Sequence, residues 1–262
     1  MVKGLVDGKV VVITGAGSGV GRAACLLFAE HGAKIVAADI SSEAVEVTAA
    51  EVEKAGGEAI AVLCDVVSAE SVESLVKAAV AKFGRLDVMY NNAGITTRPG
   101  LSFMESSDED MDKLAAVNIK GVIHGCQSAI RQFDAQGDGG AIVSTASVAG
   151  LIGFGGVLYG SSKGAITTLT RTLALEFASK GIRVNAVCPA AMPTNFGGAA
   201  LKNSELGQKH TAALHPLGRI ITPEECAAAA LFLASDLASN ITGVNLPVDG
   251  GMSAGKSLSA SR

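Results

Sequence analysis

The 262-residue sequence predicts an α/β fold in which helices cover both faces of a parallel β-sheet. Short segments rich in Val, Ile and Ala alternate along the chain with longer segments of helical period. Several short segments are apolar throughout, which is typical of strands buried on both faces. No proline precedes Pro99, so the first third of the chain can run as unbroken strand–helix repeats.

Seven strands and six long helical segments are expected. The strands are predicted at Val10–Thr14, Lys34–Asp39, Ala59–Leu63, Val88–Asn91, Ala141–Thr145, Arg183–Val187 and Val244–Val248. The helices are predicted at Gly19–His31, Ser42–Ala55, Ala69–Phe83, Asp108–Gln136, Leu158–Lys180 and Pro223–Ala234. No Pro/Gly/Ser-rich linker divides them, so residues 1–262 are expected to form a single domain, with a loosely held tail at 253–262.

Composition narrows the function classes. The net charge is −4, no basic cluster occurs and aromatic residues are 4%, which disfavours nucleic-acid binding. Five scattered cysteines without a CxxC pair indicate reduced core thiols, and the histidines show no metal-binding spacing. The uncharged stretch at 139–162 is too rich in Gly, Ser and Thr for a membrane helix, and no signal peptide precedes the first strand. We therefore expect a cytoplasmic protein with no membrane or metal partner.

A glycine-rich segment, Gly15–Gly21, joins the first predicted strand to the first predicted helix. Such a turn exposes backbone N–H groups at a helix N-terminus, where the helix dipole favours a diphosphate. Its spacing is GxxxGxG rather than GxGxxG, and an ordinary tight turn is the alternative interpretation. The segment holds 4 of the 32 glycines, and 9 more lie in residues 137–164.

Asp39 closes the second predicted strand, 18 residues after Gly21. A carboxylate there accepts hydrogen bonds from ribose hydroxyls and repels a 2′-phosphate. Its neighbours Ala38 and Ile40 are uncharged, and the glycine-rich segment has no basic residue before Arg22. These features favour NAD over NADP, with a plain turn residue at the strand end as the alternative.

Tyr159 and Lys163 are four residues apart and project from one face of a predicted helix. A nearby ammonium and a positively charged nicotinamide both favour the phenolate, so we expect the pKa of the tyrosine to fall below about 10. A phenolate can take the proton of an alcohol while hydride leaves the carbon. An exposed Tyr–Lys pair without function is the alternative.

Taken in order, the motifs of this sequence resemble those of the short-chain dehydrogenase/reductase family. The motifs are Thr14–Gly21, Asn91-Asn-Ala-Gly94, Asn118, Ser147, Tyr159-Gly-Ser-Ser-Lys163 and Asn185–Pro189. The match runs from about Asp7 to Gly251. The resemblance implies a Rossmann-like doubly wound sandwich on a seven-stranded parallel sheet of order 3-2-1-4-5-6-7, and a homotetramer.

The resemblance also implies roles for the reacting groups. Tyr159 would be the catalytic acid/base, and Lys163 would bind the nicotinamide ribose and lower the tyrosine pKa. Ser147 would hydrogen-bond the substrate oxygen. Asn118 would hold a water that links Lys163 to solvent. All four are expected to act at one catalytic centre.

Cofactor contacts are implied along the same edge of the sheet. The expected set is Gly15, Ser18, Gly19, Val20, Gly21, Asp39, Ile40, Asp65, Val66, Asn91, Ala93, Gly94, Tyr159, Lys163, Pro189 and Thr194. Asp65 and Val66 would flank the adenine, although Asp65 could equally cap a turn. Thr194 would meet the nicotinamide carboxamide.

Two positions depart from the family pattern. Ser147 stands 12 residues before Tyr159, where the family commonly has 13, and a one-residue deletion in the loop 150–160 accounts for this. Ser144 is the alternative serine. Ala190 follows Pro189 where the family often has glycine, so the loop that faces the nicotinamide is expected to take a slightly different path.

The substrate side is expected to be apolar. Residues 192–216 are predicted to form a mobile lid, which would line the pocket together with residues 96–104 and 150–157. Arg98 is one of few charges there. His210 and His215 could touch substrate or serve as surface or capping residues. An uncharged, cyclic or hydrophobic secondary alcohol or ketone is expected.

Three functions remain in competition. The favoured one is an NAD-dependent oxidoreductase acting on a secondary alcohol or its ketone. Residue 166, seven after Tyr159, is Ile, whereas enoyl reductases of similar fold place their lysine further from the tyrosine than Lys163 lies here, so reduction of a C=C bond is disfavoured. The alternatives are an NADP-dependent ketone reductase and a non-catalytic NAD-binding regulator.

Overall fold

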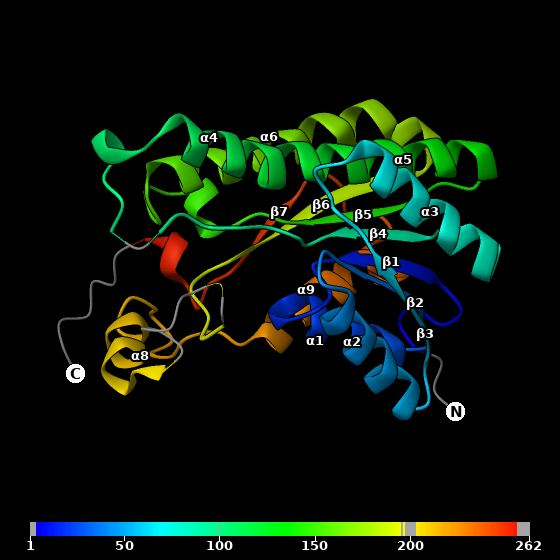
Figure 1. Ribbon diagram of the computed structural model, residues 1–262, viewed down its shortest axis with the longest axis horizontal. Coiled ribbons are helices and arrows are strands. Elements are labelled where there is room, and N and C mark those ends of the chain that lie inside the picture. The colour runs from blue at the N-terminus through cyan, green and yellow to red at the C-terminus, as the bar shows by residue number, and fades with distance from the viewer. Residues whose placement is uncertain (1–3, 99, 195, 197–202, 256–262) are drawn as a thin grey trace.

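The computed structural model describes residues 4–98, 100–194, 196 and 203–255, and its described strands form one parallel sheet (Figure 1). The strand order is β3-β2-β1-β4-β5-β6-β7, as predicted. The strands are β1 Val10–Thr14, β2 Lys34–Asp39, β3 Glu58–Leu63, β4 Val88–Asn91, β5 Gly140–Thr145, β6 Ile182–Pro189 and β7 Asn245–Val248. All six neighbouring pairs are parallel, so the carboxyl ends of the strands share one edge.

Helices pack on both faces of this sheet (Figure 1). One face carries α1 Gly19–Glu30, α2 Ser42–Lys54 and α9 Pro223–Ala234, and the other carries α3 Ala69–Phe83, α5 Gly121–Gln136 and α6 Val157–Phe177. Alternate residues of β1 enter the two separate cores: Val11 and Ile13 face the first set of helices, and Val10 and Val12 face the second. Burial on both sides is why the strand segments are continuously apolar.

Short polar residues and glycines set the helix ends. Ser41 and Ser68 accept backbone N–H groups in the first turns of α2 and α3. Thr222 and Glu225 form a capping box at the start of α9. Gly84 ends α3 in the left-handed conformation. These signals explain why most boundaries were predictable to within two residues.

Two parts of the chain differ from the sequence prediction. The segment 108–136, expected as one helix, is divided into α4 Asp108–Leu114 and α5 by a π-helical turn at Ala115–Lys120. A short helix, α8 Glu205–Ala212, lies in the region where only a lid was expected. Part of that predicted lid (195 and 197–202) and residues 256–262 of the predicted tail lie outside the described residues.

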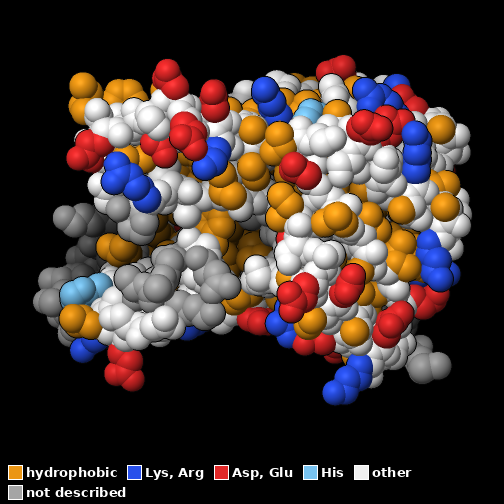
Figure 2. Space-filling model, in the orientation of Figure 1, with side chains coloured by type: hydrophobic (Ala, Val, Ile, Leu, Met, Phe, Trp, Pro, Cys, Tyr) orange, Lys and Arg blue, Asp and Glu red, His pale blue; other side chains and the backbone are white. Residues whose placement is uncertain are grey.

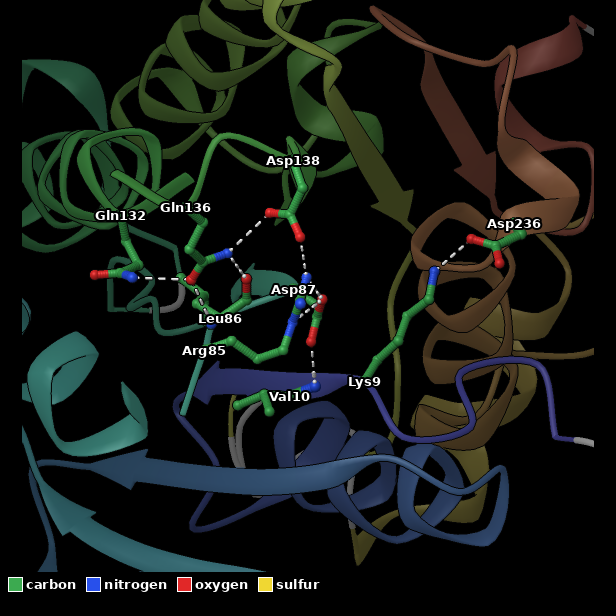
Figure 3. A network of polar contacts seen from close by, with 9 residues as sticks. All are labelled: Lys9, Val10, Arg85, Leu86, Asp87, Gln132, Gln136, Asp138 and Asp236. Atoms are coloured by element: carbon green, nitrogen blue, oxygen red, sulfur yellow. Dashed lines mark hydrogen bonds and ion pairs between the residues drawn. The ribbon is translucent and has the colours of Figure 1, made fainter. Parts of the chain in front are cut away.

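Polar side chains join the amino ends of β1, β4 and β5, at the edge away from the glycine-rich loop (Figure 3). Arg85 donates to Asp87 at 2.8 Å and to Asp138 at 2.6 Å, and Asp87 also accepts the Val10 N–H at 2.8 Å. Asp138 is held ionised, because the Arg85 guanidinium lowers the pKa of its carboxyl. This network fixes the ends of the strands without approaching the opposite edge.

The side chain of Gln136 in α5 hydrogen-bonds both backbone polar groups of Leu86, as a neighbouring strand does in a sheet. Its amide accepts the Leu86 N–H at 2.8 Å and donates to the Leu86 carbonyl at 2.8 Å (Figure 3). Two backbone groups at a fully buried residue therefore depend on one side chain.

We predict that Gln136→Ala lowers the free energy of unfolding by about 1–3 kcal/mol, because both groups of Leu86 lose their partner. Gln127→Ala is the matched control, since Gln127 is an exposed glutamine of the same helix. Urea unfolding of the three proteins measures the difference. Equal midpoints for both variants would contradict this role of Gln136.

No helix among the described residues combines the length and hydropathy that crossing a membrane requires.

Candidate active site

The loop Gly15–Gly21 follows β1 at the carboxyl edge of the sheet. Gly15 has a φ of +66° and Gly19 a φ of +52°, conformations that residues with a side chain rarely adopt. A Cβ on Gly21 would lie 2.1 Å from the Gly15 carbonyl oxygen, and one on Gly15 would lie 2.8 Å from Ala93 Cα. Glycine is therefore required where the loop closes on the start of α1 and on the end of β4.

The start of α1 presents backbone donors beside this loop. Ser18 occupies the N-cap position, is exposed and makes no side-chain capping bond within the described chain. The side chain of Val20 is buried, so this residue can offer a ligand its backbone alone. Because the first N–H groups of a helix lack partners within the helix, this end can hold an anion.

Thr14 and Asn92 lock the loop to the end of β4. The hydroxyl of Thr14 accepts the N–H groups of Asn92 and Ala93, both at 3.1 Å. The amide of Asn92 donates to the carbonyls of Thr14 at 3.0 Å and Gly15 at 3.3 Å. The role of Asn92 was not predicted, because the sequence does not reveal which donor meets which acceptor.

Asp39 lies beside the loop at the end of β2. Its carboxylate accepts the Gly17 N–H at 2.9 Å and the Ser41 N–H at 3.0 Å. Each oxygen keeps a further lone pair, so this local role leaves room for a ligand hydroxyl. Arg22, the first basic residue after the loop, forms a two-pronged ion pair with Glu51.

Apolar side chains are exposed at the ends of β2 and β3. Ile40 is 71% exposed and Leu63, whose strand register pairs it with Asp39, is 63% exposed. Val66 packs against Gly121 of α5. Asp65 is exposed and accepts the Val67 N–H at 2.9 Å. This bond agrees with the alternative interpretation of Asp65 as a residue that caps a turn.

Lys163 is the buried cation of the site, with 2% of its surface exposed. Its Nζ donates to the Thr145 carbonyl at 2.8 Å. A Cβ on Gly94 would lie 3.5 Å from this Nζ and 3.3 Å from the Asn118 Oδ1, so three separate segments converge here. Burial lowers the pKa of Lys163 to about 8.

Tyr159 lies on the same face of α6 as Lys163, whose Nζ is 5.8 Å from the centre of the tyrosine ring. Ser147 lies close enough to the hydroxyl of Tyr159 to lower the pKa of that hydroxyl. Ser147 is buried, lies 3.4 Å from the Pro189 carbonyl and accepts the Ala149 N–H at 3.1 Å. The structure thus brings Ser147 to the tyrosine.

The alternative serine, Ser144, lies within β5 and pairs in register with Asn91. Asn91 is itself buried and its amide donates to Cys126 of α5 at 3.5 Å. The side chain of Asn91 therefore faces α5, and a cofactor contact by this residue would have to use its backbone.

The expected lowering of the tyrosine pKa depends on the bound cofactor as well as on Lys163, and the unliganded protein shows the opposing effect of burial. Burial raises the pKa of Tyr159 to about 12, and the hydrogen bond from Ser147 offsets this only in part. The prediction counted the charges of Lys163 and of a bound nicotinamide, and it left out the removal of both side chains from water.

The structure restricts which groups of Asn118 could hold the expected water. Asn118 is fully buried in the π-helical turn, where it accepts the Ile95 N–H at 2.8 Å. Its amide donates to the Ile95 carbonyl at 2.9 Å and to Ser162 Oγ at 3.1 Å. Both amide hydrogens are engaged, so this amide fixes the backbone of Ile95 and cannot donate to a relay water.

Thr194 lies next to the glycine-rich loop, with its Cγ2 3.7 Å from the place a Cβ on Gly19 would occupy. Phe196 follows, and its ring is 5.9 Å from that of Tyr159 at an angle of 59°. The structure therefore places Phe196, which follows β6, against the ring of Tyr159.

Figure 2 shows the molecule hollowed between the region of α4 and the region of α8, with hydrophobic side chains inside. Exposed apolar residues occur in the segment after β4, at the start of α6, and in or near α8. They are Phe103, Met104, Val157, Phe196, Leu206 and Leu214. Of the two histidines, His210 is exposed, and His215 is buried with its Nδ1 2.8 Å from the Thr211 carbonyl. Within the described chain, no group of His, Cys, Asp and Glu could hold a metal ion.

Comparison with known proteins identifies the family. A family model described as Enoyl-(Acyl carrier protein) reductase matches residues 15–253. Meso-2,3-butanediol dehydrogenase of Serratia marcescens is 43% identical over 249 residues, which cover 95% of this chain and 96% of that protein. The chain belongs to the short-chain dehydrogenase/reductase family of oxidoreductases, whose members bind a nicotinamide cofactor.

Two solved structures agree with this assignment. A short-chain type dehydrogenase/reductase from Mycobacterium marinum has a TM-score of 0.87 at 34% identity, covering 94% of this chain and 96% of its own. Levodione reductase has a TM-score of 0.89 at 35% identity, covering 95% of this chain and 99% of its own.

We predict that the folded, unliganded protein forms no tyrosinate near pH 10. The chain has two tyrosines, and burial raises the pKa of both Tyr90 and Tyr159. The raised values mean that the unfolded chain releases these protons first, so stability falls as pH rises above about 10. Absorbance titration of folded and guanidinium-unfolded protein measures this, and a folded-state midpoint near the unfolded one would contradict it.

Proposed function

We propose that the chain is an NAD-dependent oxidoreductase that interconverts a secondary alcohol and its ketone. The proposal rests on the placement of Tyr159 beside Ser147 and the buried Lys163, whose Nζ lies 5.8 Å from the centre of the tyrosine ring. This arrangement lies at the same sheet edge as the glycine-rich helix start. A protein that only binds a dinucleotide would not need a buried acid/base group at that edge.

The residues present fit a dinucleotide. The loop Gly15–Gly21 and the first turn of α1 would hold the diphosphate, and Asp39 would accept the ribose hydroxyls. Ile40 and Val66 would cover the adenine, which accounts for the exposure of Ile40. Thr194 and Pro189, with Ala93 and Gly94, would line the nicotinamide end. When bound, NAD supplies the hydride acceptor and NADH the hydride donor.

NAD is favoured over NADP by two contacts. A 2′-phosphate bound beside the loop would lie near the carboxylate of Asp39, and like charges repel. Arg22 is occupied by Glu51 and is thereby held away from that phosphate. The NADP-dependent alternative would need Arg22 to leave its ion pair.

The proton is handled by this chain's own side chains. In the direction of oxidation Tyr159 takes the proton of the alcohol, and Ser147 donates to the substrate oxygen. Because burial raises the pKa of Tyr159 to about 12 in the unliganded protein, the phenolate needs positive charge nearby. Lys163 in its ammonium form and the cationic ring of the bound cofactor would supply that charge. A relay water beside Asn118 would use groups other than the amide hydrogens, which are engaged.

The substrate is proposed to be an uncharged secondary alcohol or ketone with a hydrophobic or cyclic body. The apolar residues around the hollow support this, as do relatives named for butanediol and levodione. Reduction of a C=C bond, which the description of the family model names, is disfavoured because Lys163 lies only four residues after Tyr159.

We also propose a cytoplasmic homotetramer. Leu175 is 84% exposed on the long helix α6, where a second copy could cover this apolar side chain. Light scattering tests this, and the mass of a single chain would refute it.

A spectrophotometric assay with cyclic secondary alcohols tests the proposed function. We expect NADH to form, with a larger kcat/KM for NAD than for NADP. Tyr159→Phe should lose activity by about 100-fold or more because the proton acceptor is gone, while NADH binding persists. Tight NAD binding without turnover of any alcohol would favour the regulator, and a clear NADP preference would favour the NADP-dependent alternative.

A further inference from the structure

Tyr90 is a buried polar residue that the proposed reaction does not use. Its side chain is fully buried, and its ring stacks on Phe28 with centres 6.4 Å apart. Its hydroxyl lies 3.0 Å from Thr145 Oγ1, and the thiol of Cys226 in α9 lies close enough to influence its pKa. A phenol in the middle of a core needs such partners, but these particular partners lead to the active site.

The direction of each hydrogen bond follows from what each group can donate. The carbonyls of Thr14 and Gly15 are acceptors only, so the amide nitrogen of Asn92 must face them. The oxygen of the same amide then faces Thr145 Oγ1 at 3.0 Å and must accept.

It follows that the single hydroxyl proton of Thr145 is donated to Asn92. Tyr90 must therefore donate its own proton to Thr145 Oγ1. The chain of donors runs in one direction, from Tyr90 through Thr145 and Asn92 to the glycine-rich loop. Reversing any bond would leave two acceptors facing each other.

Thr145 has a second connection through its backbone. Its carbonyl accepts the Nζ of Lys163 at 2.8 Å. One residue at the end of β5 thus holds the cofactor loop by its side chain and the catalytic lysine by its carbonyl.

We propose that Thr145 is a positioning residue that couples the glycine-rich cofactor loop to Lys163, with Tyr90 fixing the orientation of its hydroxyl. This inference rests on the proposed function, because it assigns both ends of the connection to one reaction. Loss of the hydroxyl would leave the oxygen of the Asn92 amide and the Tyr90 hydroxyl without their partner. The loop and the end of β5 would then be free to shift relative to each other.

The test compares three variants with the full-length protein. Thr145→Val removes the hydroxyl at nearly constant shape, and Thr145→Ser keeps it. Thr170→Val is the matched control, because Thr170 is a buried threonine of α6 whose hydroxyl bonds only the Ile166 carbonyl at 2.8 Å. The readouts are the Kd for NADH by fluorescence and the pH profile of kcat.

We expect Thr145→Val to weaken NADH binding about tenfold, the size of one lost buried hydrogen bond. It should also move the loss of activity at high pH to lower pH, since a displaced carbonyl holds the ammonium of Lys163 less well. Thr145→Ser and Thr170→Val should stay within about twofold of the parent protein. Tyr90→Phe should weaken NADH binding and shift the pH profile in the same direction as Thr145→Val, but less strongly. It replaces Thr145→Val in the test if that variant does not fold.

Several outcomes would overturn the inference. Parent-like NADH affinity and pH profile in Thr145→Val would show that the hydroxyl serves stability alone, while the proposed function would stand. The same result for Tyr90→Phe would remove Tyr90 from the connection. A parent protein that binds neither NADH nor NADPH would refute the proposed function and this inference together.

Discussion

The active site depends on burying the ammonium of Lys163 against the carbonyl of Thr145. Taking a charged lysine out of water is unfavourable. The lowering of its pKa to about 8 corresponds to a loss of about 3 kcal/mol in the free energy of unfolding below pH 8. The folded-state pKa lies below the unfolded one, so this cost fades as pH rises from 8 toward 10.5. The segments that surround Lys163 hold this cation in place.

The glycines near Lys163 show how tightly that place is built. A Cβ on Gly150 would lie 2.6 Å from the Lys163 carbonyl oxygen, and one on Gly94 would press toward its Nζ. The glycine-rich loop at the other end of the site meets the same limit between Gly15 and Gly21. The glycine excess of the sequence therefore reflects close approach of backbone segments at two places, one for the expected diphosphate and one for the reacting groups.

Much of the fold could be predicted from the sequence because the signals are local. The strands Val10–Thr14, Lys34–Asp39 and Val88–Asn91 were predicted with the bounds they have, since apolar runs with polar or glycine ends mark them. The π-helical turn at Ala115–Lys120 could not be predicted, because one widened turn hardly changes the helical period of the surrounding residues. Its effect is to bury Asn118 against the backbone of Ile95, a contact between distant segments.

The sequence predicted which residues form the candidate site better than it predicted their hydrogen-bond partners and pKa values. Motif order singled out Ser147, Tyr159 and Lys163, and the structure brings them together. The partners of Asn92 and Thr145 lie on neighbouring strands, so pairing them requires the three-dimensional arrangement. Burial raises the pKa of Tyr159 in the unliganded protein, and the sequence prediction left this effect out because burial is a property of the whole fold.

Measuring the pKa of Lys163 tests most directly whether its ammonium is buried in the site. NMR titration of the lysine side chains in the unliganded protein, with Lys163→Met to assign the signal, would report it. We predict a midpoint near 8, because burial lowers the pKa of this lysine. A midpoint near the ordinary lysine value of about 10.4 would show that the ammonium is well solvated, and would contradict the buried-cation arrangement on which the site depends.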